Sequence, residues 1–177
     1  LPQPLQERLR AYTEAGGALL ISGAYTLADL DSEDDKLFAA EVLHAAYGGY
    51  DTLAYSATTP ASIASKRQNS TCIIGDVAFS TELCRDTYAL ESVEVITPTS
   101  GDAHTILHYN SGTSAAIAYN GQHRTIVMGF PFEAITDSDM RNHTMAKSLQ
   151  FLMSKKRQPT VETEPERPRR SRRPRRQ

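Results

Sequence analysis

Residues 104–130 read HTILHYNSGTSAAIAYNGQHRTIVMGF, and this stretch decides the fold, because it holds three β-type segments separated by two turns. Asn110-Ser111-Gly112 separates the first two segments. Asn120-Gly121, one of the strongest short hairpin signals, separates the second from the third. The pattern predicts an antiparallel meander. Its strands are expected at residues 104–109, 114–119 and 124–130.

After the meander, Thr136-Asp137-Ser138 offers cap residues for a last helix. In that helix Met145, Leu149 and Leu152 repeat at i, i+4 and i+7, which predicts that they face the core. We expect the folded domain to close near Met153.

Before the meander, residues 18–22 (ALLIS) follow Gly16-Gly17 and form a continuous apolar run. Such a run is typical of a strand buried on both faces of a parallel sheet. It is preceded by Leu5, Leu9 and Tyr12 at i, i+4 and i+7, which predicts an amphipathic surface helix.

A second helix is expected at residues 33–47, capped by Asp31 or Ser32 and ended by Gly48-Gly49. The order helix, strand, helix favours an α/β fold. Residues 50–98 give only weak β signals. These are at 53–55, 71–74 and 93–96.

The length of 177 residues and the hydrophobic content of 40% predict one globular domain. No apolar run approaches the roughly 18–20 residues that a membrane-spanning helix needs. The chain opens with Leu1 and a polar helix pattern, so we expect it to be a piece of a longer protein.

The net charge of −2 is a near-cancellation of two opposite parts. Residues 155–177 hold ten basic and three acidic side chains, a charge of +7, while the rest of the chain carries −9. We therefore divide the chain into an α/β domain at 1–153 and a disordered, Arg/Pro-rich tail at 154–177. The seven arginines of the tail are Arg167, Arg169, Arg170, Arg172, Arg173, Arg175 and Arg176.

Such a polycation suits an anionic polymer, a glycan or an acidic protein surface. The alternative is a solvated tail with no fixed partner. The tail has no interleaved aromatic residues, so sequence-specific nucleic-acid recognition is not indicated.

Two longer segments resemble a known family. Residues 9–25, LRAYTEAGGALLISGAY, resemble the helix, Gly-Gly and strand step of class I glutamine amidotransferase-like domains. Residues 115–135, AAIAYNGQHRTIVMGFPFEAI, followed by a helix ending in LQFLM, resemble the closing hairpin and last helix of those domains. More narrowly, GFPFE at 129–133 is similar to the C-terminal part of secreted bacterial xanthan lyases and golvesin-domain proteins.

The resemblance implies a flavodoxin-like sheet flanked by helices, with its first strands lying upstream of this chain, and an extracytoplasmic location. It also argues against catalysis. The family places a cysteine nucleophile directly after the strand that matches residues 19–21, where this chain has Ser22-Gly23-Ala24. The family's His-Pro-Glu is replaced here by Phe130-Pro131-Phe132-Glu133, so glutaminase chemistry is not expected.

Two residues are candidate catalytic groups. Ser22 ends a strand, where a turn can expose a nucleophile, but Leu20 and Ala24 stand where a nucleophile elbow needs glycines. The alternative is a serine that hydrogen bonds to backbone. Glu133 follows a buried strand, where open α/β sheets bind ligands, or else it satisfies N–H groups of its own loop.

Two pairs of residues are weaker candidates. His104 and His108 could share a strand face, but no third metal ligand is spaced to complete a site. Cys72 and Cys84 could form a disulfide in an exported protein or remain free thiols. No cofactor is expected.

The first hypothesis is therefore a non-catalytic amidotransferase-like accessory domain of a larger exported bacterial protein, associated with the cell surface or with polysaccharide. The alternatives are a serine hydrolase or amidase that uses Ser22, and a polyanion-binding module that uses the tail.

Overall fold

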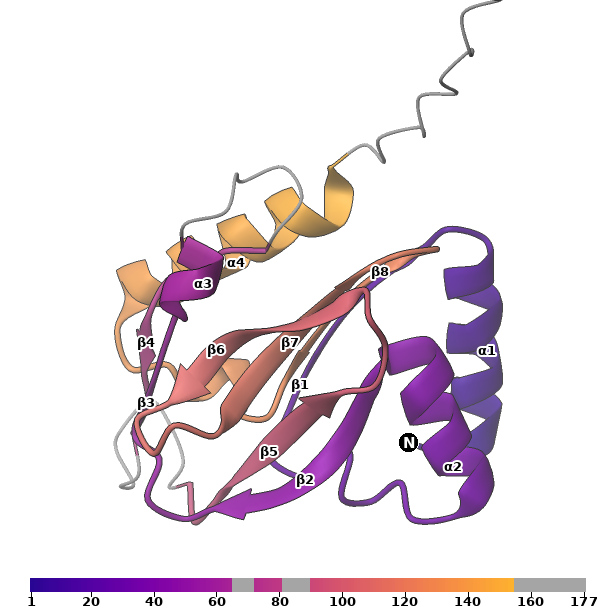
Figure 1. Ribbon diagram of the computed structural model, residues 1–177, viewed down its shortest axis with the longest axis horizontal. Helices are drawn as coiled ribbons and strands as arrows, with labels where there is room; N and C mark the ends of the chain where they lie inside the picture. The colour runs from indigo at the N-terminus through magenta and orange to yellow at the C-terminus, as the bar shows by residue number, and fades with distance from the viewer. Residues whose placement is uncertain (65–71, 81–89, 155–177) are drawn as a thin grey trace, which may run out of the picture.

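The structure is a computed structural model that describes residues 1–64, 72–80 and 90–154 (Figure 1). In the N-terminal part the elements are α1 (Gln3–Glu14), β1 (Ala18–Ser22), α2 (Glu33–Phe38), a π-helix η1 (Ala39–Leu43), β2 (Ala45–Asp51), β3 (Ser56–Thr58) and α3 (Ala61–Ala64). They are followed by β4 (Val77–Ala78), β5 (Val93–Pro98), β6 (Ala103–Tyr109), β7 (Ser114–Asn120), β8 (Arg124–Met128), a 3-10 helix η2 (Phe132–Ala134) and α4 (Ser138–Met153).

The main sheet has the strand order β1-β8-β7-β6-β3-β4. The predicted meander is confirmed, because β6 pairs antiparallel with β7 and β7 pairs antiparallel with β8. Among the described strands only β1 and β8 are parallel, with Leu20 opposite Ile126. A separate antiparallel pair, β2 and β5, makes a second sheet.

Each face of the main sheet covers its own apolar core. Leu20, Ile126 and Met128 face the core that also holds Phe151 of α4. Alternate residues such as Leu19 and Val127 face the core beneath α1, α2 and the β2–β5 pair. Figure 1 shows α4 on one side of the sheet and α1 and α2 on the other. The α/β class is confirmed. The sheet is mixed and curled, and its pairing does not establish the parallel flavodoxin-like pattern.

The prediction of a helix at 33–47 is wrong for its last residues, 44–47. The helical segment ends at Leu43, and His44 adopts a left-handed conformation with φ 55°. Gly48 and Gly49 lie inside β2, where the register against β5 shifts between Tyr47 and Tyr50. The apolar residues after His44 pack as a strand because β5 supplies the backbone hydrogen bonds that a helix would have made internally.

The inward face of α1 is also not the predicted one. Leu5 and Tyr12 are 41% and 52% exposed, whereas Gln6 and Thr13 are buried. Their polar atoms are satisfied, since Gln6 Nε2 donates to the backbone carbonyl of Leu1 and to Asp35, and Thr13 Oγ1 donates to the carbonyl of Arg10. Burial of polar groups is tolerated where each finds a partner.

In α4 the expected core face is confirmed only in part, because Leu152 packs against the core and Leu149 does not. Leu149 is 44% exposed, and the buried residues are Thr144, Ser148 and Phe151. Thr144 Oγ1 donates to the carbonyl of Ile74, so this buried hydroxyl has a partner. The predicted cap is confirmed, because the Asp137 carboxylate accepts from the N–H of Met140 at 2.7 Å.

Strand β1 was expected to be buried on both faces, and this is confirmed in part. Leu20 packs against one core and Leu19 and Ile21 against the other, but only Leu19 is buried, because β1 lies at the edge of the main sheet. Of the weak β signals, 93–96 falls within β5, while the other two lie just before β3 and β4. In the part of the chain that the structure describes, no helix has the length and apolar character to cross a bilayer.

Candidate functional site

A pocket of about 340 Å³ opens at the carboxyl end of β1. It is lined by Ser22, Gly23, Ala24, Tyr25, residues 90–92, Pro131 and Glu133. The two residues that the sequence singled out, Ser22 and Glu133, are therefore brought to one pocket although they are far apart in the chain. Their functional roles remain predictions.

Ser22 joins β1 to the turn that follows β8. Its Oγ accepts a hydrogen bond from the backbone N–H of Phe132 at 3.3 Å, and the N–H of Gly23 donates to the carbonyl of Met128 at 3.2 Å. This is the backbone-bonding arrangement that the sequence left open as an alternative. The hydroxyl hydrogen stays available to a ligand in the pocket.

No histidine is in place to activate Ser22. The five histidines of the chain, His44, His104, His108, His123 and His143, all belong to the described residues, and none of them lines the pocket. A serine hydroxyl is a weak nucleophile unless an adjacent base removes its proton. Glu133, in η2, is exposed and gives the rim of the pocket a carboxylate beside that of Glu91.

Glu94, on β5, holds the loop that follows the pocket residues Ser22 to Tyr25, and sequence reasoning missed it. Its carboxylate is fully buried and accepts from the N–H groups of Leu27 and Ala28, at 3.0 and 2.7 Å to Oε1. Burial raises the pKa of this carboxyl above its usual value, and the backbone N–H bonds partly offset that effect. Glu94 could have been singled out from the sequence, because it is the one acidic residue in the otherwise apolar segment 93–96 (VEVI).

The loop held by Glu94 carries Tyr25, which begins a group of tyrosines. The Tyr25 hydroxyl lies 3.3 Å from Ser92 Oγ, and its ring centroid lies 5.6 Å from that of Tyr50. Tyr50 in turn lies 5.2 Å from Tyr47. We call Tyr25, Tyr50 and Tyr47 the tyrosine row. All three rings are 41–50% exposed.

The tyrosine row reaches a second pocket of about 280 Å³, which Tyr47 lines together with Asp31, Lys36 and several alanines. The row therefore connects a polar pocket at Tyr25 with a more apolar pocket at Tyr47. The sequence contained a signal for this row, because two tyrosines, Tyr47 and Tyr50, lie close together in the segment that forms β2.

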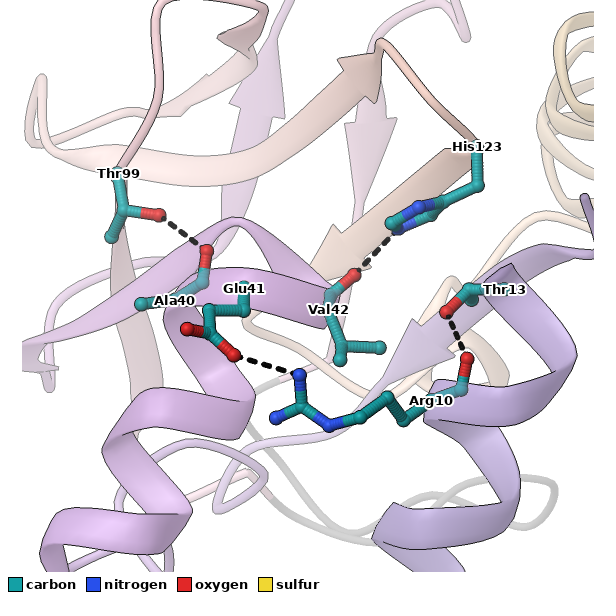
Figure 2. Close-up of polar contacts among 7 residues, drawn as sticks. All are labelled: Arg10, Thr13, Ala40, Glu41, Val42, Thr99 and His123. Carbon is teal, nitrogen blue, oxygen red and sulfur yellow. Dashed lines mark hydrogen bonds and ion pairs between the residues drawn. The ribbon is translucent and has the colours of Figure 1, made fainter.

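At the opposite end of the β1–β8 pair, a smaller pocket of about 200 Å³ is lined by Gly16, Ala18, Arg124, Leu152 and Ser154, and internal contacts hold η1 in place. Figure 2 shows how they fix η1: Thr99 donates to the carbonyl of Ala40 at 3.2 Å, and Arg10 of α1 pairs with Glu41 at 2.7 Å. The buried His123 donates from Nε2 to the carbonyl of Val42 at 2.8 Å.

His44 directly follows η1 and makes ring contacts at this end of the β1–β8 pair. Its ring lies 3.4 Å from that of Tyr119 and 5.2 Å from that of His123. Burial, followed by the nearness of His123, lowers the pKa of His44 to about 4, while Asp102 opposes the shift. His44 is therefore neutral near pH 7.

The metal and disulfide candidates gain no support. His104 is exposed, His108 Nδ1 lies 3.0 Å from the carbonyl of Gly112, and the described residues hold no cluster of three possible metal ligands. Cys72 is a buried thiol whose pKa burial raises to about 12. Cys84 and the tail arginines lie outside the described residues.

No family model matches the chain, and no curated protein matches it in sequence. Solved structures resemble it only in fold. The exo-beta-1,4-mannosidase Op5Man5 from Opitutaceae bacterium strain TAV5 is 15% identical with a TM-score of 0.50, covering 88% of this chain and 24% of its own.

The mmIFT52 N-terminal domain is 12% identical with a TM-score of 0.54 and covers 86% of this chain and 72% of its own. The cytoplasmic protein STM3548 from Salmonella typhimurium is 13% identical with a TM-score of 0.49, covering 88% and 63%. None of the three is named as an amidotransferase or a xanthan lyase. The chain thus spans about a quarter of the mannosidase, and the first two likenesses support the α/β fold alone.

Proposed function

We propose that this chain is a non-catalytic α/β domain that binds a partner or ligand at the carboxyl end of β1. The observation that carries this proposal is the state of Ser22. Its Oγ accepts from the N–H of Phe132, and all five histidines of the chain lie away from the pocket. The pocket offers hydroxyl groups and carboxylates to a ligand, and no histidine to activate the serine.

A thiol-based reaction has no better support. The turn after β1 holds Ser22 and Gly23 where an amidotransferase has its cysteine, and the thiol of Cys72 is buried and protonated near pH 7. A protonated thiol is not a nucleophile.

The wider setting is proposed from the sequence resemblance. In that proposal the chain is an amidotransferase-like accessory domain, of flavodoxin-like descent, in a larger extracytoplasmic bacterial protein that acts at the cell surface or on polysaccharide. The 24% share of the mannosidase chain is compatible with such a role, because this fold can form one part of a longer protein.

The test is a pair of activity measurements on the full chain. A fluorophosphonate probe reports an activated serine, and ammonia release from glutamine reports amidotransferase chemistry. We expect neither, with Ser22→Ala as the matched control. Labelling of the native chain that disappears in Ser22→Ala would establish the serine hydrolase instead, and ammonia release would end the non-catalytic proposal.

A further inference from the structure

The tyrosine row has an acidic group at each end. At the Tyr25 end, the pocket is lined by Glu91 and Glu133, both exposed. At the Tyr47 end, the second pocket is lined by Asp31, with Lys36 beside it. Lys36 lies 3.5 Å from Glu33, so that carboxylate partly offsets its charge. The row is therefore an exposed aromatic surface with two carboxylates at its Tyr25 end and, at its Tyr47 end, the carboxylate of Asp31 beside Lys36.

Neighbouring rings in the row are tilted to one another. The angle between ring planes is 59° for Tyr25 and Tyr50 and 68° for Tyr47 and Tyr50. Tilted rings form notches rather than a flat platform. Notches between tyrosines accept proline rings of an extended chain, and the ring faces attract guanidinium groups.

The chain itself contains a segment with this chemistry. Residues 165–176 read PERPRRSRRPRR, with three prolines and seven arginines. Pro-rich sequences favour the extended polyproline II conformation, which loses little entropy on binding. The charge of +7 on residues 155–177 complements the −9 of the rest of the chain.

The segment is long enough to reach the row. Arg124, the first residue of β8, donates to the carbonyl of Phe151 and contacts Ser154, so the described chain ends near the amino end of the β1–β8 pair. Ten residues lie between Ser154 and Pro165, so these two residues can be at most about 36–40 Å apart. Strand β1, five residues long, spans only about 17 Å.

We propose that the Arg/Pro-rich segment at 165–176 docks on the tyrosine row of its own chain, with its prolines between the tyrosine rings and its arginines at Glu91, Glu133 and Asp31. This inference rests on the proposed function in one respect, because it treats the carboxyl end of β1 as a binding surface. The positive charge and the proline rings of residues 165–176 identify this segment as the occupant.

The test measures binding of a fluorescein-labelled peptide of residues 160–177 by anisotropy. The receptor is the full chain with its seven tail arginines changed to glutamine, so that its own segment does not compete. We expect saturable binding that weakens at least tenfold in Tyr25→Ala or Tyr50→Ala and severalfold in Glu133→Gln. Tyr12→Ala on α1, a ring of similar exposure outside the row, is the matched control and leaves binding unchanged.

Three further measurements test whether charge, proline rings and the chain's own segment determine the binding. Binding weakens when sodium chloride rises from 50 to 300 mM, because exposed charge pairs are screened. It also weakens when Pro168 and Pro174 of the peptide become alanine. The native chain binds the peptide more weakly than the glutamine variant, because its own segment already occupies the row.

The proposal is overturned by no binding, by binding that Tyr25→Ala and Tyr50→Ala leave intact, or by equal affinity of the native chain and the glutamine variant. Retention of the native chain on heparin without any peptide binding would assign the segment to external polyanions. These failures are distinguishable from failure of the non-catalytic proposal, which would show as serine labelling or ammonia release.

Discussion

The two ends of the parallel β1–β8 pair are built differently. At the amino end, Arg124 and His123 donate hydrogen bonds to backbone carbonyl groups, and the ring of His44 stacks on Tyr119 while its two nitrogens are buried without a hydrogen-bond partner among the described residues. At the carboxyl end, Tyr25 and Glu133 face outward around a pocket. The amino end thus buries its side chains within the fold, whereas the carboxyl end carries exposed side chains around a pocket.

This difference shows where function can be expected in the domain. Side chains that bind a partner contribute little to stability, because they are exposed and make few internal contacts. Substitutions at the amino end should therefore change stability, while those at the carboxyl end should change binding. Glu94 is the expected exception, because it is buried and its carboxylate holds the loop that carries Tyr25.

The largest effect is expected at Glu94. Glu94→Ala leaves the buried N–H groups of Leu27 and Ala28 without an acceptor, and we expect a loss of about 3 kcal/mol in the free energy of unfolding. Glu94→Gln keeps an amide oxygen as acceptor and should lose about 1 kcal/mol. Urea unfolding followed by circular dichroism measures both, and equal losses would show that hydrogen bonding to the loop is not the cause.

Arg124→Met should have the next largest effect. The guanidinium of Arg124 is buried, bonds to the last carbonyl groups of α4 and lies 5.4 Å from the ring of Phe151. Methionine keeps the aliphatic bulk but removes the charged donor, and although the carbonyl of Phe151 still accepts from Ser154, we expect a loss of about 2 kcal/mol. Thermal unfolding measures it. An unchanged melting temperature would mean that α4 does not need this anchor.

A smaller effect, dependent on pH, is expected at His44. Its pKa in the folded protein is about 4, below the usual 6.5, so the unfolded chain takes up the proton first as the pH falls. Stability should therefore be lost between pH 6.5 and 4. We expect about 1–2 kcal/mol, because the ring is partly exposed and solvent screens part of the shift.

His44→Asn is the control for this pH effect, because asparagine tolerates the left-handed backbone at φ 55° and carries no titrating ring. Urea unfolding of both proteins at pH 7 and pH 4.5 isolates the histidine. If the two proteins lose the same stability, the stacked imidazole is not responsible.

The smallest effect on stability is expected at Tyr25. Its ring is half exposed and contacts Tyr50, so Tyr25→Ala should change the free energy of unfolding by about 0.5 kcal/mol or less. A loss above 2 kcal/mol would make Tyr25 a structural residue and remove the contrast between the two ends.

Short sequence patterns predicted the elements that depend mainly on neighbouring residues, such as turns and helix caps. The Asn-Gly turn and the three β-type segments predicted β6, β7 and β8, and Asp137 predicted the start of α4. The sequence also named Ser22 and Glu133, although only folding brings them to one pocket.

The remaining features depend on contacts between distant segments. Strand β2 looked helical because Val42 and Ala45 fit a helical period, and its strand form requires pairing with β5. Gln6 and Thr144 replace apolar residues in the buried helix faces because partners far along the chain satisfy them. The tyrosine row combines one loop residue with two residues of β2, so no single window of sequence contains it.

The most direct test of the contrast between the two ends is chemical-shift mapping of the ¹⁵N-labelled full chain with its tail arginines changed to glutamine, titrated with the peptide of residues 160–177. We predict shifts at Gly23, Tyr25, Tyr47, Tyr50 and Glu133, with little change at His44, His123 and Arg124. Shifts confined to the amino end, or spread evenly over the acidic surface, would contradict the assignment of binding to the carboxyl end of β1.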